Sequence, residues 1–370
     1  MRTPRFISIA LFILINVLFV DKYTARITEW HAVVSIAYAL FTLGVLFVLP
    51  QLLKRIHHPQ RWLWVLACGL ILTGIGIQYA IDPMGLQVDR WSAIHHFLDG
   101  MLEGTYPYGQ QTHLGGYGSP FPVWQVLHIP FYALGNVGLS IFIILGLYIF
   151  SVWRIYGDHV GLVATVLLLL SPAIWYEIAV RSDLITNIMF VAILVEWLMY
   201  YRIELREHAV ALAILAGLLL STRLVAVIPL AVVYGYAFLK LDWKKQCLFI
   251  GVVATVFALT MLPFLFWEGS TLLFFEYNPF VLQTRQGSIL ALGLFAAIAI
   301  GITIFQKENL QLRHVVTGGL LSCLVVIAFI EKMWIEDAWN ALYSSMFDIT
   351  YLSLALPFYI IAISRFEVKC

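Results

Sequence analysis

Three polar residues in a largely apolar chain have the chemistry of a reactive site: Asp89, Asp183 and Arg223. A carboxylate within hydrogen-bond reach of a hydroxyl group can act as a general base, and a guanidinium can hold a phosphate. Arg223 follows Ser221 and Thr222 between two short apolar runs, where freed backbone N–H groups would also favour an anion. The plainer alternatives are that Asp89 and Asp183 cap helices and that Arg223 reaches toward lipid head groups.

A second polar group, His95, His96 and Asp99, lies within one expected helix. His95 and Asp99 are four residues apart and therefore share a helical face, which makes them weak candidates for a metal site. The adjacent histidines point about 100° apart, so a solvated polar face explains the group equally well. We therefore predict no definite metal site, and we keep His95 and His96 as candidate substrate ligands.

Three more residues are candidate substrate ligands, each with a structural alternative. Tyr106 and Tyr108 could line a substrate site, although aromatic rings at a membrane surface commonly anchor a loop at the interface. Arg181 could bind substrate or serve as a solvated counter-charge to the nearby Asp183.

The elements that position these residues must be membrane helices. Of 370 residues, 62% are hydrophobic and only 12% are charged, which excludes an ordinary soluble domain. The mean hydropathy is +0.90. A formal charge of +1 provides no basic field for nucleic acid, and the four cysteines form no C-x-x-C pair or disulfide framework.

Apolar runs between charge clusters predict about twelve membrane crossings. The pair on either side of residues 221–223 could instead be one broken helix. We predict an all-α, polytopic transmembrane helix bundle that forms one domain over residues 1–370. The runs are residues 6–20, 31–49, 62–81, 137–153, 160–175, 184–201, 209–220, 224–239, 247–266, 289–305, 315–330 and 347–364.

The charge distribution orients this bundle. With the N and C termini cytoplasmic, about two-thirds of the 22 Lys and Arg residues fall in cytoplasmic segments, as the positive-inside rule requires. Most carboxylates then lie on the outer face. We expect a multi-pass integral protein, and we expect its membrane to be the plasma (inner) membrane.

Residues 82–136 form a large first outer loop with amphipathic surface helices. Its first part, residues 89–103, carries Trp91, Ile94, Phe97 and Leu98 at helical spacing, which predicts a helix lying along the membrane surface. A Gly/Tyr-rich turn at residues 115–118 follows. Residues 122–134 are apolar but interrupted, and they predict a second surface or re-entrant helix.

The order of these motifs resembles the GT-C superfamily of polytopic membrane glycosyltransferases, especially its mannosyltransferase-like branch. The matching features are Asp89 before an amphipathic helix, Gly104-x-x-Pro107-Tyr108, Pro120-x-Pro122, Ser171-Pro172 ahead of Arg181-Ser182-Asp183, and Ser221-Thr222-Arg223. The resemblance covers residues 89–239. The chain departs from the family pattern because no Tyr stands four residues after Asp89, Gly118-Ser119-Pro120 replaces Tyr-Pro-Pro, and Asp-x-Asp is missing at residues 87–89.

The resemblance implies transfer of a sugar, with mannose favoured, from a polyprenyl-phosphate carrier to a lipid or glycan acceptor. The reaction would take place at the outer or lumenal membrane face with inversion at the anomeric carbon. Asp89 would be the general base, Asp183 a second catalytic carboxylate and Arg223 the ligand of the carrier phosphate. The resemblance implies no definite cofactor, and it leaves open whether the reaction uses a divalent metal. The implied partners are the donor, the acceptor and membrane lipid.

Two other classes of protein are alternatives to a glycosyltransferase. A secondary transporter would show paired halves with broken helices and ionisable groups at the membrane midplane. This chain has one candidate break, at residues 221–223, and no obvious second copy. The third class is a membrane scaffold or a relative that has lost activity.

Overall fold

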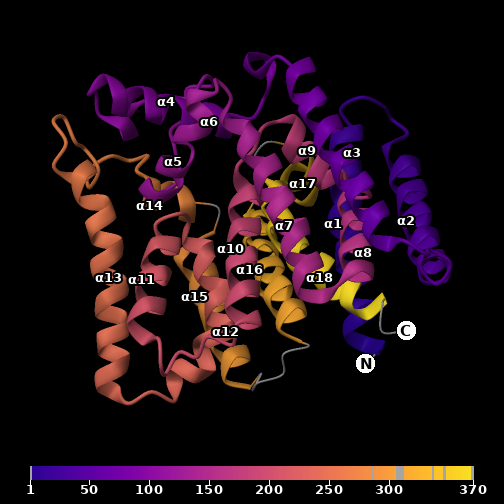
Figure 1. Cartoon of the computed structure of the whole chain (residues 1–370). Coiled ribbons are helices and arrows are strands. Elements are labelled where there is room, and N and C mark those ends of the chain that lie inside the picture. Colours follow the sequence, from indigo (N-terminus) through magenta and orange to yellow (C-terminus); the bar gives the residue numbers. More distant parts are fainter. Residues whose placement is uncertain (1, 286, 306–311, 336, 345–346, 368–370) are drawn as a thin grey trace.

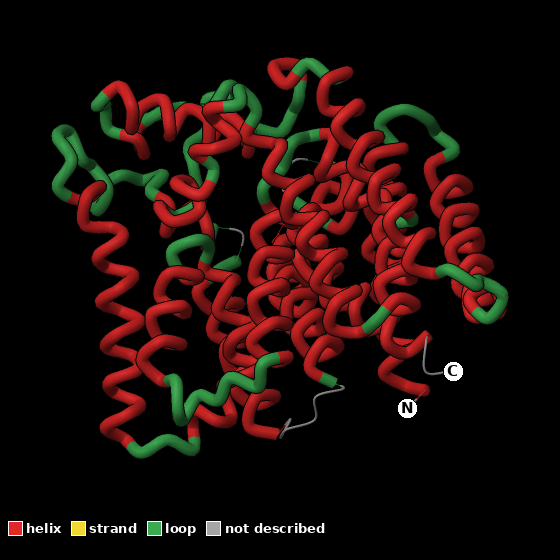
Figure 2. The backbone as a smooth tube through the Cα atoms, in the orientation of Figure 1, coloured by secondary structure: helices red, strands yellow, loops and turns green. Residues whose placement is uncertain are grey.

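The protein is described here by a computed structural model that covers residues 2–285, 287–305, 312–335, 337–344 and 347–367. Within these ranges the chain consists of helices joined by loops and forms no β-strand, apart from one isolated bridge between Gln111 and Tyr117 (Figure 2). The predicted all-α fold class is confirmed.

Within the described ranges, seven helical segments are long and apolar enough to cross a membrane, and α8 (Asp158–Leu169) with α9 (Pro172–Ala179), bent by 66°, forms an eighth candidate. Four shorter apolar segments are α10 (Leu184–Tyr200), α11 (Ala209–Leu220), η4 (Leu224–Ala226) with α12 (Val227–Leu239), and α15 (Ile289–Phe305). These elements support a membrane-embedded bundle. The seven are α1 (Arg2–Thr24), α2 (His31–Leu53), α3 (Pro59–Ala80), η3 (Val137–Leu139) with α7 (Ser140–Tyr156), α13 (Trp243–Leu265), α16 (Arg313–Ile335), and η5 (Ile349–Ala355) with α18 (Leu356–Glu367).

Several short helices gather at one end of the bundle. Figure 1 shows α4, α5 and α6 there, while the start of α1 and the end of α18 lie together at the opposite end. The predicted amphipathic helix is α4, and its apolar residues are buried within the protein. The short elements are η1 (Pro83–Gly85), α4 (Arg90–Glu103), η2 (Pro107–Gly109), α5 (Pro122–Leu127), α6 (Ile129–Ala133), α14 (Pro279–Thr284) and α17 (Ala338–Tyr343).

Two apolar clusters hold the molecule together. The larger fills the bundle around η5 and α18, where 83% of the residues in the apolar stretch are buried. In the apolar stretch of α13, by contrast, only 11% of the residues are buried. The smaller cluster joins Phe97 and Tyr108, from the segment of residues 82–136, to Met261 and Phe264 of α13. The segment formed by η5 and α18 is therefore the centre of the bundle, and the segment of residues 82–136 packs on the end of α13.

Candidate functional site

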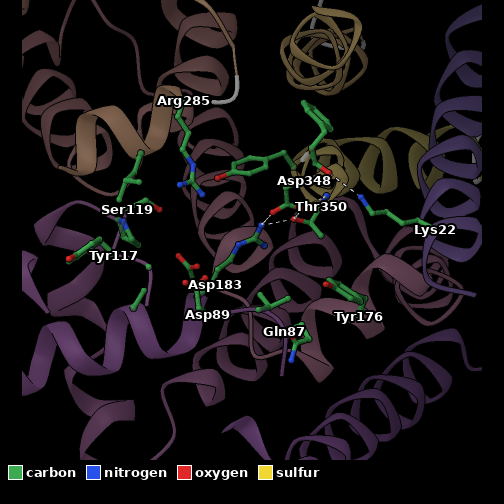
Figure 3. Close-up of a pocket in the computed structure, with 18 of the residues that line it drawn as sticks. Lys22, Gln87, Asp89, Tyr117, Ser119, Tyr176, Asp183, Arg285, Asp348 and Thr350 are labelled. Atoms are coloured by element: carbon green, nitrogen blue, oxygen red, sulfur yellow. Dashed lines mark hydrogen bonds and ion pairs between the residues drawn. The ribbon is translucent and has the colours of Figure 1, made fainter. Parts of the chain in front are cut away.

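A cavity of about 510 Å³ brings together residues from distant parts of the chain (Figure 3). Asp89, Asp183 and Arg223, three of the predicted site residues, all line it. The other predicted site residues do not. The cavity also receives Arg90 from α4 and Asp348 from the segment before η5, so both halves of the chain build it.

Asp89 stands directly before α4, yet its side chain makes no capping hydrogen bond to that helix. Its Oδ2 instead accepts a hydrogen bond of 2.7 Å from Thr112 Oγ1, and Thr112 Oγ1 accepts one from the backbone N–H of Gly116. A Cβ atom at Gly116 would lie 2.6 Å from Asp89 Oδ2. Glycine at this turn therefore allows the carboxylate to pack against the backbone while it lines the cavity.

Asp183 and Arg223 form a buried ion pair, with 2.6 Å between Asp183 Oδ2 and Arg223 Nη2 and only 2–3% of each side chain exposed. Trp124 Nε1 donates a second hydrogen bond of 2.8 Å to the same oxygen. Burial alone would raise the pKa of the Asp183 carboxyl, but the Arg223 guanidinium holds it below its usual value. Asp183 makes no side-chain cap to α10, so its carboxylate serves the pair.

Backbone contacts fix the position of Arg223. The N–H groups of Phe121 and Val123 donate to the carbonyl groups of Thr222 and Ser221, each at 3.1 Å, and thereby join the segment of residues 82–136 to the break between α11 and α12. Gln283 bridges the same two segments. Its Nε2 donates to Ser119 O at 2.7 Å, while its Oε1 accepts from Leu224 N at 2.8 Å.

Arg90, which the sequence analysis did not single out, ties three segments together. Its guanidinium donates to Ser182 Oγ at 2.8 Å and to Asp348 Oδ2 and Thr350 Oγ1 at 2.5 Å each. A Glu177 oxygen lies 3.4 Å away. Burial would raise the pKa of the Asp348 carboxyl, but Arg90 and the Thr350 hydrogen bonds hold it below its usual range.

The cavity carries an excess of positive charge. Its lining includes six basic and three acidic residues. Asp183 and Asp348 are paired with Arg223 and Arg90, whereas Asp89 has no ion pair among the described residues. The remaining cations make the cavity suited to an anion. The basic residues are Lys22, Arg26, Arg90, Arg223, Arg285 and Lys332.

Arg181, a predicted substrate ligand, contacts α3 in the structure. Its Nη2 donates to the carbonyl oxygens of Gln78 at 2.6 Å and Ile81 at 3.3 Å, which caps the C-terminal end of α3. Its backbone adopts a left-handed conformation with φ of 52°. The residue is outside the cavity lining and joins the turn before α10 to α3.

The two predicted tyrosines also lie outside the cavity lining. Tyr108 is 2% exposed, donates to Pro120 O at 3.1 Å and packs against Phe97 and Phe264. Tyr106 packs at the edge of the same cluster. These contacts indicate that both rings stabilise the fold of residues 82–136.

The histidine group on α4 does not assemble a metal site. His95 Nε2 lies 3.8 Å from Asp99 Oδ2, His96 Nδ1 contacts Gln111 O at 2.6 Å, and Asp99 accepts a hydrogen bond from Tyr132. Burial lowers the pKa of His95. Among the described residues no three His, Cys, Asp or Glu side chains group as metal ligands. In the cavity two of the three carboxylates already bind arginines, so this donor set does not fit a divalent ion held by the protein.

The overlooked residues left only weak signals in the sequence. Arg90 directly follows Asp89, and Asp348 falls at the start of the apolar run 347–364. An ionisable residue at the edge of a membrane segment is itself a sign of a site. That rule could have drawn attention to Asp348, although nothing in the sequence pairs it with Arg90.

Comparisons with known proteins add no assignment, since no family model, curated protein or solved structure matches this chain.

Proposed function

We propose that the protein is a GT-C-like glycosyltransferase that transfers a sugar, with mannose favoured, from a polyprenyl-phosphate carrier to a lipid or glycan acceptor. The observation that carries the proposal is the convergence of Asp89, Asp183 and Arg223 on one cavity with an excess of cations. The resemblance in motif order had selected these three residues from segments far apart in the chain. A cavity of this charge suits an anionic donor.

The proposed reaction assigns a separate task to each group. The acceptor oxygen forms a bond to the anomeric carbon as the bond from that carbon to the phosphate oxygen breaks. The hydroxyl proton moves to the Asp89 carboxylate, and the carrier leaves as a lipid phosphate. Arg223 and Arg285 stabilise the negative charge on that phosphate, and Asp183 positions Arg223 through their ion pair.

An apolar cleft beside the cavity suits the carrier's hydrocarbon chain. This cleft of about 80 Å³ shares Phe347 and Tyr351 with the cavity. The rest of its lining includes Val225, Leu292 and Val325, from η4, α15 and α16. A polyprenyl phosphate has this division into an anionic end and an apolar chain.

We also propose that the chain crosses the membrane twelve times. The bent α8–α9 pair and the four shorter apolar segments, added to the seven longer ones, would give the expected twelve crossings. The cavity would then open at the outer face of the plasma (inner) membrane, with both termini cytoplasmic. Secondary transport is the second candidate, because the bent pair and the break between α11 and α12 are similar to the interrupted helices of transporters.

Sugar transfer by the purified full-length chain separates the two functions. We expect transfer from labelled polyprenyl-phosphate mannose to a membrane-lipid extract in detergent, with less or none from the glucose and arabinose carriers. Proteoliposomes provide the other arm, in which uptake of the free sugars is measured. Uptake without transfer from any of the three donors would overturn the glycosyltransferase proposal.

Two arginines provide a matched test of the cavity. Arg285→Gln should raise the KM for the donor about tenfold, because a charged hydrogen bond to phosphate is worth about 1.5–3 kcal/mol. Arg181→Gln should leave that KM unchanged and lower the free energy of unfolding by about 1–3 kcal/mol, since two helix-end carbonyls lose their donor. Donor titrations and thermal unfolding measure the two effects. The opposite pattern would place the phosphate at Arg181.

A further inference from the structure

The cavity has two positively charged ends, and the proposed donor phosphate uses only one of them. Figure 3 shows Arg285 and Lys22 on opposite sides of the cavity, with Asp348 and Thr350 between them. We call the end of the cavity with Arg223 and Arg285 the donor end, because these two residues are the proposed ligands of the donor phosphate. The other end lies where α1 finishes, and Lys22, Tyr23 and Arg26 line it.

Lys22 is a buried cation with an unused donor. Its side chain is 3% exposed, and its Nζ donates to the carbonyl oxygens of Ser344 and Phe347, each at 3.0 Å. A lysine ammonium has three N–H donors. The described part of the chain gives the third no hydrogen-bond partner and gives Lys22 no ion pair. The nearby carboxylate of Asp348 is already bound by Arg90.

Arg26 and two tyrosines complete this end of the cavity. The Arg26 guanidinium lies 5.0 Å from the centre of the Tyr23 ring, which stacks on Tyr176 with 4.2 Å between ring centres. Tyr23, Arg26 and Tyr176 all line the cavity. Arg26 is exposed, and no carboxylate of the described residues lies within ion-pair distance of it. A buried cation, an exposed cation and two stacked rings together form a wall suited to a phosphate ester.

From this arrangement we infer that the wall formed by Lys22, Tyr23, Arg26 and Tyr176 binds a phosphate ester in the head group of the acceptor. The inference rests on the proposed function and narrows it: the acceptor is an anionic lipid whose head group carries both a phosphate and a hydroxyl group. The phosphate would bind at Lys22 and Arg26 while the hydroxyl reaches Asp89. A neutral glycan would leave this end without a partner.

Direct binding tests the wall without requiring sugar transfer. The probes are dihexanoyl phosphatidylglycerol, glycerol 3-phosphate and dihexanoyl phosphatidylcholine, titrated calorimetrically into the full-length protein in a non-ionic detergent. We expect saturable binding of the glycerol lipid, weakened by added salt, and little binding of the zwitterionic choline lipid. Binding of glycerol 3-phosphate as tightly as the lipid would identify a soluble phosphate ester as the ligand and overturn a lipid acceptor.

Three variants locate the binding. Arg26→Gln, at an exposed position, should weaken binding of the glycerol lipid about tenfold, consistent with loss of one charged hydrogen bond. Arg285→Gln should leave this affinity unchanged, because it alters the other end. Arg61→Gln, an exposed arginine near the start of α3, is the matched control and should also leave it unchanged.

The results separate failure of this inference from failure of the proposed function. Weaker binding in Arg285→Gln but not in Arg26→Gln would assign the lipid to the donor end and overturn the inference. Equal loss in all three variants would show binding to general surface charge and would also overturn it. Loss confined to Arg26→Gln supports the wall as an anion site, whereas sugar transfer is decided by the separate donor assay.

Discussion

Asp89→Asn should lower sugar transfer by about 10²–10⁴-fold, the usual contribution of a general base, while thermal unfolding stays close to that of the wild type. The amide keeps the shape of the carboxylate and can still accept a hydrogen bond from Thr112, but it cannot take up the acceptor proton. Because the Asp89 side chain makes no cap to α4, its replacement removes no helix-capping bond. Initial rates at saturating donor and acceptor, together with a melting curve, measure both effects.

Two companion variants sharpen this test. Asp99→Asn changes a carboxylate on the same helix that binds Tyr132 outside the cavity lining, and it should retain transfer. Gly116→Ala keeps Asp89 but introduces a Cβ 2.6 Å from its Oδ2, so the carboxylate must move and kcat should fall without a change of charge. Full activity in Asp89→Asn, or equal losses in Asp89→Asn and Asp99→Asn, would rule out Asp89 as the base.

Arg223→Met should produce the largest loss of stability among these variants, about 3–5 kcal/mol. The change leaves the Asp183 carboxylate buried beside Trp124 without its counter-ion, and an unpaired buried charge carries a large desolvation penalty. Thermal unfolding of the purified protein in one detergent, with intrinsic tryptophan fluorescence as the signal, measures the loss.

The double variant Arg223→Met/Asp183→Leu separates stability from donor binding. Removing both charges should restore most of the stability, since replacement of a buried ion pair by apolar residues is often neutral. The restored protein should still be inactive, because the donor phosphate lacks Arg223. A stable single variant would contradict the buried pair, and an active double variant would remove Arg223 from the proposed site.

The sequence predicted the parts of this structure that depend on local patterns. Apolar length identified the membrane helices, and the spacing of Trp91, Ile94, Phe97 and Leu98 identified α4. The polar triplet at residues 221–223 marked the break between α11 and α12. These signals lie within a few residues of the feature they predict.

The sequence did not reveal partners that only the folded chain brings together. Arg90 and Asp348 are 258 positions apart, and the apolar run that contains Asp348 was taken as an ordinary span. Arg181 was a candidate ligand by its position near Asp183, but its guanidinium contacts the backbone of α3 and the residue lies outside the cavity lining. Tyr108 matched a family motif, yet its ring packs against α13.

The long separation of Arg90 and Asp348 also affects how the protein is made. At roughly 5–20 residues per second, a ribosome needs about 13–50 s to synthesise the 258 positions between them. During that interval Arg90 lacks the carboxylate that later binds it, and the central C-terminal segment has not been inserted. Completion of the cavity therefore waits until residue 348 has been made, so a chain truncated before that residue would lack the carboxylate that binds Arg90 and would have no finished site.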